Sequence, residues 1–341
     1  MINNNILKIA SNDNSPENVK VLTNITKDSY TFADLNNTFI IFKSINNILY
    51  LVYSNINKSI VLFDLNNLKL ISEIKPYNNE NIIGFRHYLD KIEKRDLIMG
   101  IYLENNIRLF DAIDFKCILN IPHIYNKGYL FSSCFLNQDN NNYIITSNCN
   151  WIGNSENIKI FDFNGNKIKE INSSFDKTVN IDTYYDKVKS KNYIIAGNYY
   201  YSKSYDYIKN ELYQKNCDNE NGSHGINIIN DSEEIIQLID SCIDGNIRIF
   251  NFHSGLLLKK ILICNNILFA ICLWSNDYLF VGCDDNTIKL VDLKNELIIK
   301  SLIGHENRII SIKKLNLFKY GECLISQGWK SDQIKLWIKI N

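Results

Sequence analysis

Several residue types in this sequence could support catalysis or metal binding, but their spacing does not. The histidines occur singly, with no H-E-x-x-H motif and no pair at metal-ligand spacing. Two carboxylate pairs, Glu233-Glu234 and Asp284-Asp285, fall where turns are expected, so we interpret them as turn groups rather than acid–base catalysts. No glycine-rich phosphate-binding loop is present. The five histidines are His87, His123, His224, His253 and His305.

The cysteines give no clearer sign of chemistry. There are nine, and none stands in a C-x-x-C pair that would indicate a zinc or redox motif. Cys134, Cys242, Cys272 and Cys283 lie in apolar segments, where a free cysteine behaves as a small hydrophobic residue. We find no general base placed to activate a thiol. The sequence therefore predicts no enzymatic activity, no metal and no cofactor.

Composition narrows the class of protein further. The 341 residues carry 37 basic and 37 acidic side chains, and only five of the basic residues are arginine. A net charge of zero gives no electrostatic reason to expect nucleic acid or an anionic membrane as the partner. The first residues contain no apolar run typical of a signal peptide, and no stretch reads as a membrane span. We expect an intracellular, cytoplasmic protein.

One short sequence pattern recurs along the chain. It indicates the secondary-structure elements that position the histidines, carboxylates and cysteines named above. Segments such as NIRLFD (106–111), NIKIFD (157–162) and TIKLVD (287–292) share an apolar residue near their end. Successive copies are 41 to 51 residues apart, the period typical of a β-propeller blade. Within the third copy, Lys159 between Ile158 and Ile160 shows the alternation of a strand with one polar face. The recurring positions are Phe63, Phe110, Phe161, Tyr205, Phe250, Val291 and Trp337.

These copies predict an all-β, seven-bladed β-propeller of four-stranded antiparallel blades in a single domain, 1–341. The last copy, IKLWIKIN, ends after three strands, so a strand from the other end of the chain must complete it. Residues 18–26 have the right pattern, and residues 6–10 are a competing candidate. The expected blades span about 38–74, 82–121, 129–171, 180–216, 225–262, 268–303 and 308–341.

The last blade also carries motif residues of a known family. Gly304-His305, Ser326 and Trp337 follow one another as they do in WD-repeat (WD40, β-transducin-type) propellers, which the chain resembles. The resemblance implies that His305, Ser326 and Trp337 form a buried hydrogen-bonded set with a turn aspartate. Asp332 lies one place later than that aspartate usually does, and Ile338 replaces the aspartate after the tryptophan.

In that family, the loops before the first strand and between the second and third strands of each blade gather on one face, where ligands commonly bind. Exposed tryptophan, tyrosine and arginine anchor many interfaces, so we expect partner binding by such residues in these loops. The alternative is that each aromatic packs on its own loop. The candidates are Tyr102, Trp151, Tyr199, Tyr200, Arg308 and Trp329.

The sequence therefore predicts a non-catalytic protein–protein interaction scaffold that binds peptide segments or subunits of a larger intracellular complex. We expect the chain to act as a monomer within a hetero-complex with protein or peptide partners. A phosphoinositide- or membrane-binding propeller is one alternative, although no Arg-Arg pair of the lipid-binding type occurs. An RNA-associated scaffold is another, disfavoured by neutral charge and scarce arginine.

Overall fold

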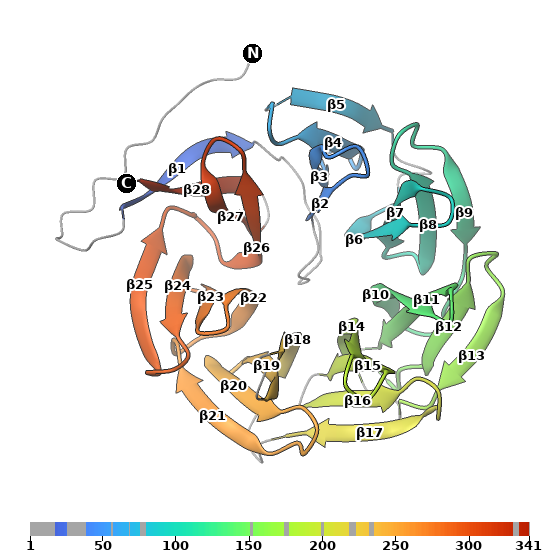
Figure 1. Ribbon diagram of the computed structural model, residues 1–341. Helices are drawn as coiled ribbons and strands as arrows, with labels where there is room; N and C mark the ends of the chain where they lie inside the picture. Colours follow the sequence, from blue (N-terminus) through green and yellow to red (C-terminus); the bar gives the residue numbers. More distant parts are fainter. Residues whose placement is uncertain are drawn as a thin grey trace.

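The alternating apolar residues of the sequence form β-strands throughout the described part of the chain. The computed structural model describes residues 18–25, 39–55, 57–67, 69–75, 80–150, 153–173, 177–198, 201–217, 223–231, 235–329 and 334–340. Within these ranges the regular secondary structure consists entirely of β-strands, which form seven four-stranded sheets. Figure 1 shows these sheets as blades arranged in a ring. The expected seven-bladed β-propeller is confirmed.

Each blade runs from an innermost strand to an outermost strand (Figure 1). Blade one contains β2 (Phe39–Lys43), β3 (Leu49–Ser54), β4 (Ile60–Asp64) and β5 (Lys69–Ile74), and blade two β6 (Ile82–Asp90), β7 (Arg95–Tyr102), β8 (Asn106–Asp111) and β9 (Cys117–Ile121). Blade three contains β10 (Tyr129–Gln138), β11 (Asn141–Cys149), β12 (Ile158–Asp162) and β13 (Lys167–Ile171), and blade four β14 (Thr178–Asp186), β15 (Lys191–Asn198), β16 (Ser202–Asp206) and β17 (Glu211–Asn216). Blade five contains β18 (Ser223–Asp231), β19 (Ile236–Cys242), β20 (Asn246–Asn251) and β21 (Leu257–Leu262), and blade six β22 (Leu268–Ser275), β23 (Tyr278–Cys283), β24 (Thr287–Asp292) and β25 (Leu297–Ile303). Blade seven contains β26 (Ile309–Leu317), β27 (Gly321–Gly328), β28 (Ile334–Ile340) and β1 (Asn18–Ile25).

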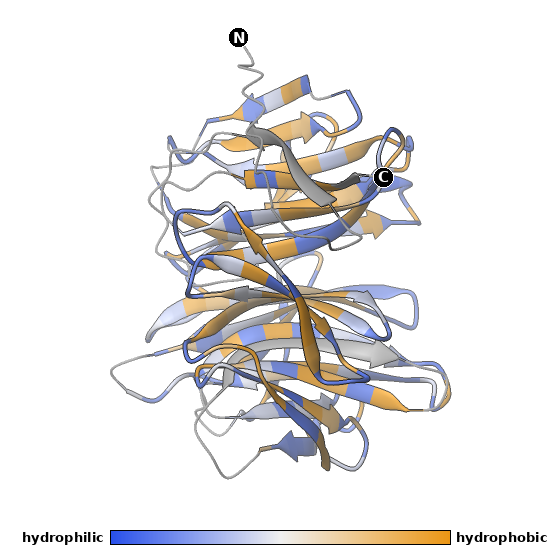
Figure 2. Cartoon of the chain, turned by 90° about the vertical axis from the view of Figure 1, so that its left-hand side faces the viewer, coloured by the Kyte–Doolittle hydropathy of each residue, from blue (hydrophilic) through white to orange (hydrophobic). Residues whose placement is uncertain are grey.

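The hydrophobic core lies between the blades. Along β3, Leu51 and Tyr53 pack against blade seven, whereas Val52 between them packs against blade two. Each pair of neighbouring blades shares one such apolar cluster. The alternation of hydrophobic and hydrophilic positions along the strands is visible in Figure 2. Because each fully buried aliphatic side chain contributes roughly 1.5–3 kcal/mol, every interface between blades stabilises both of its members.

Ring closure depends on β1, which comes from the other end of the chain. It pairs antiparallel with β28, with Val21 opposite Trp337 and Ile25 opposite Ile334 (Figure 1). A register shift between Val21 and Thr23 marks a bulge beside Trp337. The fourth strand of blade one has the same irregularity beside Phe63, so β1 reproduces the geometry of an ordinary outer strand. The strand expected at 18–26 thus completes the last blade, and the competing segment 6–10 lies outside the described residues.

The recurring aspartate after the aromatic position caps the turn between the third and fourth strands. Asp206 Oδ1 accepts hydrogen bonds from the backbone amides of Ile208 and Lys209, each 3.0 Å long. Asp64 and Asp292 accept equivalent bonds two and three residues downstream. Such local side-chain bonds favour turns over continued strand. In these blades the aspartate therefore fixes where the third strand ends at one face of the ring.

We predict that deleting residues 1–26 destabilises the whole ring, because β28 loses its only outer neighbour in the sheet. The melting temperature, measured by calorimetry, should fall on the order of 10 °C. Deletion of residues 1–17 keeps β1 and serves as the control, with an unchanged melting temperature. Equal melting of both truncated chains and the intact protein would show that β1 does not stabilise the ring.

Candidate partner-binding face

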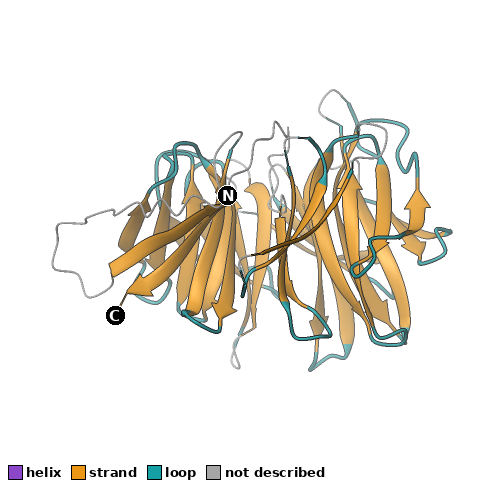
Figure 3. Cartoon of the chain, turned by 90° about the horizontal axis from the view of Figure 1, so that it is seen from above, coloured by secondary structure: helices purple, strands orange, loops and turns teal. Residues whose placement is uncertain are grey.

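The ring has two ends where loops emerge (Figure 3). Two of the sequence-predicted residues, Arg308 and Trp329, belong to one of these ends. We call this end the loop face: it carries the connections into each first strand and those between the second and third strands. Arg308 directly precedes β26, and Trp329 directly follows β27. The Trp329 amide donates a 2.9 Å hydrogen bond to the Arg308 carbonyl, which joins the two loops of blade seven.

The Arg308 side chain is stacked between two aromatic rings. Its guanidinium carbon lies 4.1 Å from the ring centre of Trp329 and 4.5 Å from that of Phe269 in blade six. Phe269 is 3% exposed, whereas Arg308 and Trp329 are half-buried. Stacking of this kind contributes about 0.5–2 kcal/mol and holds the guanidinium in one orientation. The structure thus brings together two of the predicted partner-binding residues and presents part of each on the loop face.

Tyr102 does not belong to this surface. It is the last residue of β7 and only 2% exposed, and it packs in the cluster between blades one and two. The Arg108 guanidinium lies 4.6 Å above its ring, and burial raises the pKa of Tyr102 to about 12. The expectation of an exposed anchor was wrong, because the strand extends one residue further than the loop assignment assumed.

The remaining predicted anchors fall outside the described residues: Trp151, Tyr199 and Tyr200. Their described neighbour Tyr201 is half-buried, with the ammonium groups of Lys203 and Lys215 lying 5.1 and 4.1 Å from its ring centre. Blade four therefore presents an aromatic ring beside two lysine ammonium groups on the loop face.

His305, Ser326 and Trp337 meet inside blade seven. The indole Nε1 of Trp337 donates a 2.7 Å hydrogen bond to Ser326 Oγ, and His305 Nε2 lies 2.7 Å from the same oxygen. All three residues are buried, with Ser326 fully so. Asp332, the fourth residue expected in the set, lies outside the described residues.

A set of buried cations on the third strands was missed by sequence reasoning. Two positions before the recurring aromatic, blades two to seven each carry a lysine or arginine, whereas blade one has Val61. Five of these six side chains belong to residues that are only 3% to 9% exposed, and Lys289 is half-buried. The alternation around Lys159 therefore does not mark a solvent-facing side, because that face of the strand packs against the preceding blade. The six are Arg108, Lys159, Lys203, Arg248, Lys289 and Lys335.

Each buried cation reaches towards the loops of the loop face. Arg248 makes two bonds to the Asp244 carboxylate, of 3.0 and 2.7 Å, and Lys289 makes one of 2.7 Å to Asp285. Lys335 donates to the carbonyl of Gly304. Charge-assisted bonds of this kind are among the stronger ones in proteins, and a buried charge requires them. The cations consequently fix the loops rather than offer free charge to a ligand.

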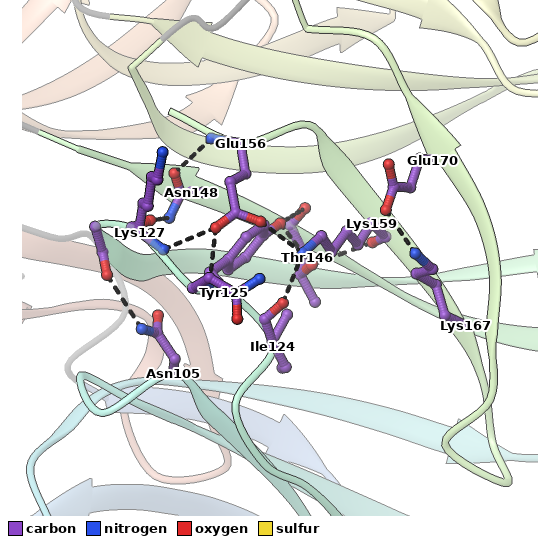
Figure 4. Close-up of polar contacts among 12 residues, drawn as sticks. Asn105, Ile124, Tyr125, Lys127, Thr146, Asn148, Glu156, Lys159, Lys167 and Glu170 are labelled. Carbon is purple, nitrogen blue, oxygen red and sulfur yellow. Dashed lines mark hydrogen bonds and ion pairs between the residues drawn. The ribbon is translucent and has the colours of Figure 1, made fainter. Parts of the chain in front are cut away.

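Blade three shows the most extended of these networks (Figure 4). The Lys159 ammonium donates 2.8 Å bonds to Glu156 Oε2 and to the carbonyl of Ile124, and lies 4.6 Å from the ring centre of Tyr125. The Tyr125 hydroxyl lies 2.8 Å from Thr146 Oγ1. The network joins the connection from blade two to the loop that continues towards Trp151. It positions the described part of the connection between β11 and β12.

Hydrogen bonding keeps Glu156 ionised in this network. Burial raises the pKa of Glu156, but bonds from the Lys159 ammonium and from the backbone amides of Lys127 and Asn126 outweigh it. The pKa therefore lies below its usual value of 4.5. The carboxylate remains charged at neutral pH and neutralises the buried lysine.

The innermost strands carry charged residues around the centre of the ring, which sequence reasoning also missed. Arg86 on β6 of blade two reaches 3.4 Å from Ser132 Oγ of blade three and from the Ile181 carbonyl of blade four. Burial and the positive charge of Arg86 lower the pKa of Lys313 on β26, while Asp182 on β14 opposes that shift. The guanidinium thus ties three blades together at the ring's centre.

The expectations that the two carboxylate pairs are turn groups and that no metal is bound can be compared with the structure only in the described part of the chain. Asp285 caps a turn through Thr287 and pairs with Lys289, which lowers its pKa despite the opposing effect of burial. Glu233 and Glu234 lie outside the described residues. Among the residues that are described, no group of three histidine, cysteine, aspartate or glutamate side chains could hold a metal ion.

We predict that Glu156→Gln lowers the free energy of unfolding by about 2 kcal/mol near neutral pH, because Lys159 loses its counter-charge. Since the folded-state pKa of Glu156 is depressed, its contribution is complete above about pH 4.5 and is lost as the pH falls through the folded value. Urea unfolding at a series of pH values should show the difference between variant and wild type shrinking in acid.

Glu170→Gln is the matched control in the same blade. Glu170 pairs with Lys167 at 2.7 Å, but these side chains are 35% and 53% exposed, so the loss should stay below about 1 kcal/mol. Equal destabilisation by the two substitutions would contradict the assigned role of the buried pair.

Comparison with known proteins gives one short similarity. No protein-family model matches the chain. A stretch of 74 residues, 22% of the chain, is 34% identical to the U3 small nucleolar RNA-associated protein 21 homolog of Schizosaccharomyces pombe. The match covers only 8% of that relative's length. The described ranges contain no helix long and apolar enough to span a membrane. The seven-bladed ring and this match together support a propeller family for the chain.

Proposed function

We propose that the chain is a non-catalytic protein–protein interaction scaffold that binds peptide segments or subunits of a larger complex on its loop face. The observation that carries this proposal is the stack of Arg308 between Phe269 and Trp329. An arginine and a tryptophan that are stacked together and still partly exposed can bury further area on binding and lose little entropy. Fold alone does not determine function, so the proposal rests on these residues.

We also propose that the propeller is of the WD-repeat type. The bonds among His305, Ser326 and Trp337 support this assignment, because the resemblance places the same three residue types in one buried set. Blades two to six would then be divergent copies, which share the buried cation of blade seven but carry another residue at the position of Trp337.

The electrostatics of the loop face disfavour a partner of high net charge and favour a protein partner. Arg248 and Lys289 are already paired with Asp244 and Asp285 inside their own blades. With these two charges satisfied internally, recognition would rest on side chains such as Arg308 and Trp329. The chain's zero net charge agrees with a partner of mixed character.

An RNA-associated scaffold is the second candidate, since the similar protein is named as associated with a small nucleolar RNA. Tyr201, with Lys203 and Lys215 beside its ring, has the residue types of a site where a base could stack. The relative's name also makes the nucleolus the alternative to the cytoplasmic location that the sequence suggests. Microscopy of the tagged protein distinguishes the two compartments.

We expect affinity purification of tagged wild type to recover a defined set of proteins, and Trp329→Ala to lose them, because the substitution removes one side of the Arg308 stack. Mass spectrometry measures the recovered set, and thermal melting checks that the variant folds. Phe318→Ala is the matched control, since Phe318 is a fully exposed aromatic of the same blade located between β26 and β27, at the opposite end.

The outcomes separate the candidate functions. Loss of partners in Trp329→Ala but not in Phe318→Ala supports the loop face, and the reverse result overturns it. Partners that disappear from wild type after ribonuclease treatment favour the RNA-associated scaffold. If no protein is recovered, the scaffold function is rejected, and binding to phosphoinositide-containing liposomes tests the remaining membrane alternative.

A further inference from the structure

In six of the seven blades, the third strand presents two apolar residues to the following blade. In blade three these are Ile158 and Ile160, which pack in the cluster between blades three and four. Blade four has Ser202 and Ser204 instead, and both serines are fully buried. It thus places hydroxyl groups where the other blades place hydrocarbon. The six apolar pairs are Ile60 and Leu62, Ile107 and Leu109, Ile158 and Ile160, Ile247 and Ile249, Ile288 and Leu290, and Ile334 and Leu336.

Asn216 extends this departure from the repeat to the fourth strand of blade four. It lies opposite Ser202 and is 1% exposed, whereas the residue opposite Ile158 in blade three is Ile171. Neither Ser204 Oγ nor the side-chain amide of Asn216 forms a hydrogen bond with a described residue. Buried polar groups left in this way cost free energy, which they recover when water reaches them. In the other five blades the equivalent residues are Ile74, Ile121, Ile261, Leu302 and Ile25.

Blade five meets these polar residues with a buried carboxylate. Asp240 on β19 is 2% exposed, and its Oδ2 accepts a 2.6 Å hydrogen bond from Ser202 Oγ. The equivalent residue of blade six is Val281, which packs in the apolar cluster between blades five and six. We call the interface formed by Ser202, Ser204 and Asn216 of blade four with Asp240 of blade five the polar seam. Polar groups thus replace hydrocarbon on both of its sides.

His253 joins the same two blades at the end of their interface away from the loop face. The residue lies in the turn between β20 and β21 of blade five. Its Nδ1 is 2.9 Å from the Tyr213 hydroxyl and 3.1 Å from the Lys189 ammonium, both of blade four. Its Nε2 is 3.3 Å from Asp186 Oδ2, and the ring centre of Tyr193 lies 6.5 Å from that of the imidazole. Because an ammonium group can only donate, Nδ1 accepts and the imidazole is neutral in this arrangement.

Acid weakens this contact, because a protonated Nδ1 can no longer accept a hydrogen bond. Burial and the positive charge of Lys189 lower the pKa of His253 from 6.5, and the charge of Asp186 only partly opposes them. When the blades separate, the imidazole enters water and its pKa returns to about 6.5. The separated state therefore binds the proton more tightly, and separation becomes more favourable as the pH falls below about 6.5. Burial raises the pKa of Tyr193, so this neighbour stays neutral throughout this range.

We propose that the ring opens at the polar seam, where blades four and five separate, and that protonation of His253 promotes the opening. Separation of other blades exposes isoleucine and leucine to water, which costs more free energy than exposing hydroxyl, amide and carboxylate groups. Water that enters the polar seam also supplies hydrogen-bond partners to Ser204 and Asn216. The chain between β17 and β18 keeps the two blades covalently attached when they separate. The proposal does not depend on the scaffold function.

Native cysteines report on the opening of individual interfaces. Cys242 of blade five is 1% exposed and follows Asp240 by two residues, on the same side of β19. Cys283 of blade six stands at the equivalent position of β23 and packs in the cluster between blades five and six. The two cysteines are therefore matched reporters, one for the polar seam and one for an apolar interface.

The test treats the full chain with dithiodipyridine, which also reacts with thiols in acid, and mass spectrometry follows the labelling of each cysteine. Protection is the labelling rate in the urea-unfolded chain divided by the rate in the native chain at the same pH. At about pH 7.5, we expect Cys242 to be at least about tenfold less protected than Cys283, given the cost of unsatisfied buried groups. Between about pH 7.5 and about pH 5.5, the protection of Cys242 should fall by up to about tenfold, and that of Cys283 should stay constant.

Two substitutions separate the parts of the proposal. In His253→Gln the side chain no longer titrates, so the protection of Cys242 should become independent of pH. Ser204→Val places an apolar residue where the other blades have one, and it should raise the protection of Cys242 by about tenfold. His123→Gln, which changes an exposed histidine between blades two and three, is the matched control and should keep the acid response of wild type.

Other results would overturn the proposal. Equal protection of Cys242 and Cys283 rejects the polar seam as the opening point, as does lower protection of Cys323, which packs between blades seven and one. An acid response that is the same for Cys242 and Cys283, or that persists in His253→Gln, rejects the role of the histidine. If a variant does not fold, as judged by thermal melting, the protection of the two cysteines in wild type and its pH dependence decide the question.

Discussion

A four-stranded blade that has apolar residues on both faces cannot stand alone, and this constraint governs the whole molecule. Leu51 and Val52 are neighbours on one strand, yet they belong to the cores of different interfaces. Every blade therefore needs two neighbours, and the ring is stable only when the last blade meets the first. Pairing of β1 with β28 completes the sheet of blade seven, and the cluster shared by blades seven and one closes the core.

Packing on both faces has a consequence for polar residues in the third strands. A charge placed there faces another blade instead of water, so it must find its partner within reach of its own side chain. Arg248 reaches Asp244, and Lys159 reaches Glu156 and a carbonyl of the preceding connection. The partners lie in loops, so the same bonds that satisfy the buried charges also set the shape of the loop face.

The period and the closing strand could be predicted from sequence, because both depend on spacing and alternation. The steps between Phe63 and Trp337 define the blades without any knowledge of their packing. Alternation does not distinguish a face towards water from a face towards another blade, so the burial of Lys159 was missed. Tyr102 was misplaced for a related reason: one residue more of strand moves a side chain from the surface into an interface.

The chain order in blade six places a buried ring beside the stack that we propose for partner binding. Leu268 pairs with Cys283, and the next residue is Phe269, whose ring lies 4.5 Å from the guanidinium carbon of Arg308. Because Phe269 is only 3% exposed, it has little freedom to move within the closely packed interior. The connection between β21 and β22 therefore leads directly into the ring that contacts the arginine. Packing in blade six thus helps to set the orientation of the arginine that blade seven presents.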